Sequence, residues 1–163
     1  MNPLRYLRPA VYAALTSPAV VLAGGATVPV RAYGSGPELV YLLLSPDQDT
    51  QNLTLAGRAC DQWDCTLLVD VVTLHANGAL SVALADEAAD AVTQHLHRNR
   101  LALPAGLQIL RATVESMNGG SALDGEQVDI HRYLRVRYTI AYSIPTGPAP
   151  TPPLITNAVF TDA

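Results

Sequence analysis

The chain has 163 residues, a length typical of one domain, and 49% of them are hydrophobic while 15% are charged. This composition is too apolar for a disordered chain, and the low charge indicates that part of the surface is buried against partner proteins. The net charge of −4 repels nucleic acid and anionic membranes, so it disfavours sequence-specific nucleic-acid binding.

Neither the two cysteines nor the N-terminal residues form a recognised redox, zinc-binding or targeting motif. Cys60 and Cys65 have a C-x4-C spacing that matches neither a redox motif nor a zinc site, so two free thiols are predicted. Arg5 and Arg8 precede an apolar run, as in a signal peptide, but prolines interrupt that run. No stretch approaches the roughly 18 uninterrupted apolar residues of a membrane span.

The first predicted element is an amphipathic helix over about residues 3–15, with Asn2 as its N-cap and Pro3 at its first position. Its apolar residues recur at helical spacing, and Pro18 limits its C-terminal end. Gly24-Gly25 mark a turn. Two short apolar runs, 28–33 and 39–44, flank a Gly-Ser-Gly-Pro turn and predict a β-hairpin.

The middle of the chain alternates polar and apolar stretches. Residues 45–64 are polar and rich in Asp, which predicts a long, mobile loop that orders on assembly. Residues 66–74 are almost continuously apolar apart from Asp70, as expected of a central strand covered on both faces. Helical spacing then predicts a second helix over about residues 80–98, acidic near its start and basic near its end.

Two long strands follow. Residues 107–117 alternate well enough for a strand, and a glycine-rich connection leads to a second strand that ends near Ile144. In this last strand even-numbered residues 134–142 form an apolar face, and Tyr133, Arg135, Arg137 and Thr139 form a cationic face. The fold class is therefore α+β, with both helices on one face of a mostly antiparallel sheet. Residues 1–144 form the domain, and 145–163 form a Pro-rich extension.

Candidate catalytic and metal-binding residues do not converge in the sequence. His95 and His97 would point about 200° apart around a helix, and His75 and His131 lack a recognisable nucleophile motif nearby. No glycine-rich loop runs from a strand into a helix, as a phosphate site requires. Asp47, Asp49, Asp61 and Asp64 lack the spacing of a calcium loop. We therefore predict no catalytic residues, metal or cofactor.

Arg132, Arg135 and Arg137 form the densest basic cluster of this acidic chain, and two of them share a strand face with Tyr133. One interpretation is a solvated sheet face. The other is an intersubunit surface that meets the acidic segment holding Asp47, Asp49, Asp61 and Asp64 in a ring contact. The sequence does not choose between the two.

The order of elements, taken with several short motifs, resembles a known family. The motifs are the helix Leu7–Leu15, then Val30-Arg31-Ala32-Tyr33, then the strand Leu67–Val72, an Ala-rich helix ending His95-Leu96, and the closing run His131–Tyr138. Over about residues 4–142 this pattern is similar to the tail-completion proteins of long-tailed phages, which are related to the tail terminators of lambda-like viruses. The family has no invariant signature.

The resemblance implies a structural virion protein without catalytic residues. Such a subunit forms a ring, usually a hexamer, during assembly in the host cytoplasm. The ring caps the head-proximal end of the tail tube and joins the tail to the head connector. Its partners would be further copies of itself, the tail tube protein and the connector or stopper protein. The Pro-rich extension and the long acidic segment depart from the family pattern.

Two alternatives remain open at this point. Within the structural class, a head-tail connector, a stopper or a tail tube subunit would also bind in rings. From another class, a small hydrolase or metal-dependent enzyme would use His75, His95 or His131. Two of these histidines meeting a carboxylate in one pocket would favour the enzyme.

Overall fold

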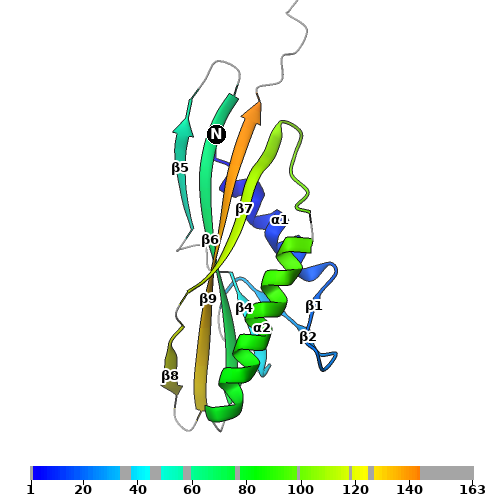
Figure 1. Ribbon diagram of the computed structural model, residues 1–163, viewed down its shortest axis with the longest axis vertical. Helices are drawn as coiled ribbons and strands as arrows, with labels where there is room; N and C mark the ends of the chain where they lie inside the picture. The colour runs from blue at the N-terminus through cyan, green and yellow to red at the C-terminus, as the bar shows by residue number, and fades with distance from the viewer. Residues whose placement is uncertain are drawn as a thin grey trace, which may run out of the picture.

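The computed structural model describes residues 2–33, 38–44, 49–56, 60–75, 78–98, 100–117, 119–124 and 127–143. Two helices, α1 (Leu4–Thr16) and α2 (Gly78–Arg98), lie on the same side of a set of long strands (Figure 1). The strands are β1 (Val20–Val21), β2 (Thr27–Val28), β3 (Val30–Arg31), β4 (Val40–Leu43), β5 (Thr50–Leu55), β6 (Cys60–His75), β7 (Leu107–Met117), β8 (Ser121–Asp124) and β9 (Gln127–Ser143).

The main sheet has the strand order β3-β4-β6-β9-β7, with β5 added beside β6 and β8 beside β9. Every pairing in it is antiparallel except that of β3 with β4. The long central pair is β6 and β9, which runs from Cys60 opposite Ser143 to His75 opposite Val128. The predicted α+β class, with a mostly antiparallel sheet and a central strand over residues 66–74, is confirmed.

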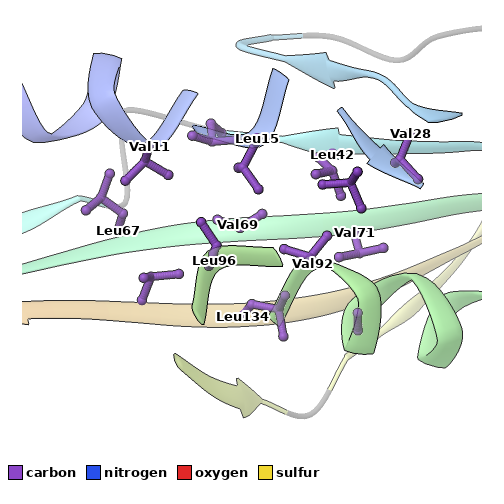
Figure 2. Close-up of a cluster of buried hydrophobic side chains, with 14 of the residues drawn as sticks. Val11, Leu15, Val28, Leu42, Leu67, Val69, Val71, Val92, Leu96 and Leu134 are labelled. Atoms are coloured by element: carbon purple, nitrogen blue, oxygen red, sulfur yellow. The ribbon is translucent and has the colours of Figure 1, made fainter. Parts of the chain in front are cut away.

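The core lies between the helices and one face of the sheet. Val11 and Leu15 of α1 and Val92 and Leu96 of α2 point at the sheet, where Val69 lies among them (Figure 2). The even-numbered residues of β9 from Leu134 to Ile140 are buried in the same cluster. Both helices therefore cover one face, as their apolar stripes predict. Burial of this apolar surface is the main force that holds the helices in place.

The ends of α1 follow the predicted capping pattern. The side-chain carbonyl of Asn2 accepts a hydrogen bond of 3.4 Å from the backbone N–H of Arg5, as an N-cap residue does. At the other end, Ser17 has extended backbone geometry and precedes a proline. The helix thus ends at Thr16, close to the predicted boundary. No helix in the described part of the chain is long and apolar enough to cross a membrane.

The predicted hairpin over 28–33 and 39–44 is wrong. Val30 and Arg31 pair with Leu42 and Leu43 in parallel, while Thr27–Val28 pairs instead with β1. Gly25 has φ of +83°, which suits the tight turn of that β1–β2 pair. The apolar runs were identified, but their composition does not fix strand direction.

The loop assignment for residues 45–64 is also wrong for the part described. Thr50–Leu55 forms β5, which pairs with Thr66 to Gln62 of β6. Strand β5 lacks an apolar alternation because it is an edge strand exposed on both faces. Similarly, Ser121–Asp124 of the predicted glycine-rich connection is β8, paired with Gln127–Ile130. Whether residues 45–64 are mobile before assembly stays a prediction. The Pro-rich extension, 145–163, lies outside the described residues.

Candidate functional site

The face of the sheet opposite the helices is the candidate functional site, and we call it the open face. Along β9 it presents His131, Tyr133, Arg135, Arg137 and Thr139, which alternate with the buried core residues. The register places Asp64, Thr66, Leu68 and Asp70 of β6 on one side of them and Arg111, Thr113 and Glu115 of β7 on the other. Most of these residues line an open depression of about 650 Å³.

Arg135 and Arg137 lie at the centre of the open face. Arg135 is opposite Leu68 on one side and Glu115 on the other, and Arg137 is opposite Thr66. The guanidinium of Arg137 lies 3.4 Å from the carboxylate of Glu115, and both side chains are about half exposed. An exposed pair of this kind contributes only about 0–1 kcal/mol to stability. Little stability is therefore lost if these arginines are changed.

Arg132 does not join them. It belongs to the opposite alternation of β9, and its Nε donates a hydrogen bond of 2.6 Å to the carboxylate of Asp86 on α2. The predicted cluster of three arginines is thus divided between two faces of the sheet, because successive strand residues point to opposite sides. Only Arg135 and Arg137 stand beside Tyr133 on the open face.

The four predicted acidic residues are also separated. Asp64 lies on the open face and accepts a hydrogen bond of 2.7 Å from the Thr139 hydroxyl. Asp49 forms an ion pair with Arg8 of α1, and burial raises its pKa more than the guanidinium lowers it. Asp61 is half-buried opposite Tyr142, and Asp47 lies outside the described residues. These acids therefore do not form one loop-borne cluster.

A histidine–carboxylate pair occupies the other end of the open face. His131 Nδ1 lies 2.8 Å from Asp70 Oδ2, and the His131 ring stacks on Tyr133 with 6.0 Å between centroids. The hydrogen bond with Asp70 raises the pKa of His131. In the sequence, Asp70 is the polar exception in an apolar strand, and His131 is a candidate acid or base. Their pairing depends on the β6–β9 register, which the sequence does not specify.

The other nucleophilic and basic groups do not complete a catalytic arrangement among the described side chains. His95 Nε2 is 2.8 Å from the carbonyl of Ala14 and links α2 to α1, whereas the side chain of His75 lies outside the description. Cys65 adjoins the depression, but burial raises its pKa to about 11, which keeps the thiol protonated and unreactive. The described residues include no group of three or more potential metal ligands.

The sequence predicted the arginines and Tyr133 but not their neighbours on β7. Glu115, Thr113 and Arg111 belong to the open face because a bulge between Ile109 and Arg111 shifts the alternation by one residue. The alternation over 107–117 was visible in the sequence. The bulge was not, so the face of each residue could not be assigned.

Comparisons with known proteins find a likeness among solved structures. No family model matches the sequence, and no curated protein matches it. Among solved structures, the chain is similar to one described as "Virion of native gene transfer agent (GTA) particle". The TM-score is 0.53 with 25% identity, and the likeness covers 83% of this chain and 96% of that chain. The shared fold thus spans nearly all of a protein found in a virion.

Proposed function

We propose that this chain is a structural protein of a virion and acts by binding other protein subunits. The observation that carries the proposal is the likeness to a chain of the gene transfer agent virion, which extends over 96% of that chain. A likeness confined to a common substructure would support the fold alone. The open face adds a second argument, because it presents polar and charged groups on a sheet, and its described residues form no recognised catalytic arrangement.

The finer proposal is that the protein caps the head-proximal end of a tail tube and joins the tail to the head connector as a homo-oligomeric ring, a hexamer in the related tail terminators. The sequence motifs of the tail-completion family support this role, and they run through elements that form the core. The role needs a compact subunit with one face free for partners. Here the helices cover one face of the sheet (Figure 1), and they leave the part of the other face around Arg135 and Arg137 uncovered.

Within that role, Arg135, Arg137 and Tyr133 are proposed to contact a partner subunit, with Asp64 of the same face contributing an acid. Arg132 and Asp49 already have partners within the chain, Asp86 and Arg8 respectively. The contacts therefore centre on the open face. A charge pair that is desolvated in an interface can weaken binding by about 2–5 kcal/mol when one partner is truncated, far more than an exposed pair.

The test is the double reversal Arg135→Glu with Arg137→Glu. Both side chains are partly or fully exposed, so we expect the isolated subunit to keep its melting temperature. We expect the yield of complete particles, with tails joined to heads, to fall at least tenfold. Arg5→Glu with Arg100→Glu is the matched control, because both residues are exposed and the charge change is the same. Particle yields that match the wild type would show that the open face is merely solvated.

A further inference from the structure

The two outer strands at one end of the sheet, β5 and β7, flank the same stretch of the central pair β6 and β9. Strand β5 pairs with residues 62–66 of β6, which pair with residues 137–141 of β9, which in turn pair with residues 108–113 of β7. Thr50, Thr66, Arg137 and Thr113 therefore form one row across four strands. Asn52, Asp64, Thr139 and Arg111 form the next row.

Both outer strands have a free edge in the described part of the chain. Strand β5 pairs only with β6, and β7 pairs only with β9. A free edge presents unpaired backbone N–H and C=O groups, and proteins that avoid association protect it with lysine, proline or a covering segment. Neither strand contains lysine or proline, and the six residues of β5 carry no charge at all. Each strand has a bulge, and β7 also carries Arg111 and Glu115, but the backbone of both edges has no covering segment among the described residues.

Exposed leucines mark the same two edges. Leu53 and Leu55 of β5 are 47% and 57% exposed, and Leu110 of β7 is 53% exposed. Few large apolar side chains of the described residues are this exposed, and three of them sit at the two free edges. Covering such leucines with a neighbouring chain would remove apolar surface from water. The edges therefore combine unpaired backbone with apolar side chains.

The directions of the two edge strands match each other. Strand β7 is antiparallel to β9, β9 to β6, and β6 to β5, so β5 and β7 run in opposite directions. When a second copy is placed beside the first in the same orientation, its β5 meets β7 as an antiparallel neighbour. Each edge has a register shift next to the row of Trp63 and Ile140, on the Gln62 side of that row in β5 and on the Thr139 side in β7.

The β7 edge carries a positive charge at Arg111, and the β5 edge carries polar but uncharged side chains. Arg111 is an exposed residue of the edge strand β7, and it forms no ion pair among the described residues. In the same row, the β5 edge presents Asn52, with the carboxylate of Asp64 one strand further in. A long side chain such as arginine reaches directly opposite and diagonal neighbours on the adjacent strand. A copy joined at this row would bring Arg111 towards Asp64 of the next copy.

We propose that β7 of one subunit pairs edge to edge with β5 of the next copy of this chain, so that the sheet continues from subunit to subunit. This proposal rests on the proposed function in that it names the contact that builds the ring. The contact is heterologous, since two different edges meet, and such contacts close into rings when the rotation per subunit allows it. The open faces of successive subunits then form one continuous surface that carries Arg135 and Arg137.

The experiment uses two single substitutions, Leu53→Lys on β5 and Leu110→Lys on β7, because a lysine at a sheet edge opposes pairing. The control is Val82→Lys, which places the same charge on an exposed apolar residue of α2. Molar mass is measured by light scattering for each purified full-length chain. We expect a ring for the wild type and for Val82→Lys, and monomers for each edge variant alone.

An equimolar mixture of the two edge variants then tests which edges meet. Each variant keeps one competent edge, and the two competent edges are complementary, so the mixture should form a dimer that grows no further. The dimer also shows that both variants are folded. A monomeric wild type, rings in both edge variants, association of one variant with itself, or a mixture without dimers would each overturn the proposal. Incorporation of the wild type into particles is measured separately, so failure of this contact is distinguishable from failure of the virion role.

Discussion

At the scale of single residues, the hydrogen bond between His131 and Asp70 couples the stability of the fold to pH. Asp70 is buried in β6, and only one of its two oxygens has a partner among the described residues, namely His131. The hydrogen bond raises the pKa of His131 above its ordinary value of 6.5. A raised histidine pKa means that folding favours the protonated form, so the pair stabilises the protein below pH 6.5 and loses that contribution as the pH rises through the raised pKa.

We therefore predict that His131→Gln lowers the melting temperature more at about pH 5.5 than at about pH 9. His97→Gln is the control, since it makes the same substitution at an exposed histidine of α2. Thermal melts of the three chains at both pH values provide the measurement. An equal loss for His131→Gln at both pH values would mean that the pair does not carry the pH dependence.

Gly119 and Gly120 differ sharply in the space around them. A Cβ added to Gly119 would lie 1.7 Å from the carbonyl oxygen of His131, whereas one added to Gly120 would meet nothing within 4 Å. We predict that Gly119→Ala destabilises the fold by at least about 1–3 kcal/mol, as overpacking does, and that Gly120→Ala stays within about 0.5 kcal/mol of the wild type. Chemical denaturation measures both. Similar stabilities for the two variants would contradict the close approach of this segment to β9.

At the scale of elements, the central strand β9 should carry much more of the stability than the edge strand β7. Leu134 of β9 is fully buried in the cluster drawn in Figure 2. Leu110 of β7 is exposed. We predict that Leu134→Ala costs about 2–5 kcal/mol, because it removes buried methyl groups and leaves a cavity. Leu110→Ala should cost less than about 0.5 kcal/mol in the monomer. Comparable losses in urea unfolding would show that β7 belongs to the core.

The elements that sequence predicts best are those with a periodic apolar pattern. Both helices, the strand 107–117 and the alternation of β9 are confirmed because burial on one side dictates which residues are apolar. The sequence predicts a loop in place of strand β5, because an edge strand exposed on both faces carries no periodic apolar pattern. The direction of β3 against β4 also escaped prediction, since strand pairing depends on long-range contacts that composition does not record.

The candidate site was predictable to the same extent. Alternation in β9 placed Arg135, Arg137 and Tyr133 together, and the open face bears this out geometrically. The alternation does not predict the ion pair of Arg132 with Asp86 on α2 or that of Asp49 with Arg8 on α1. Both ion pairs join elements that are far apart in the sequence. Whether the open face contacts a partner subunit stays a prediction.

At the scale of the whole molecule, the two faces of the sheet differ in burial and in charge. One face and the two helices form the main core, and a smaller buried cluster of Tyr41, Val72 and Leu74 lies on the opposite face. The part of that face around Arg135 and Arg137, with the free edges of β5 and β7, is the surface proposed for protein partners. Such a division suits a subunit whose function is assembly. It also predicts that substitutions on the open face and at the edges reduce assembly without changing the stability of the monomer.

The most direct test of the virion role is the amount of this chain in purified particles. Particles are isolated from cells that carry the gene, and the chain is quantified by mass spectrometry relative to the other structural proteins. We expect a small, fixed number of copies per particle that persists through repeated purification. A copy number that falls with each purification step, or complete particles of normal yield from cells that lack the gene, would contradict the account.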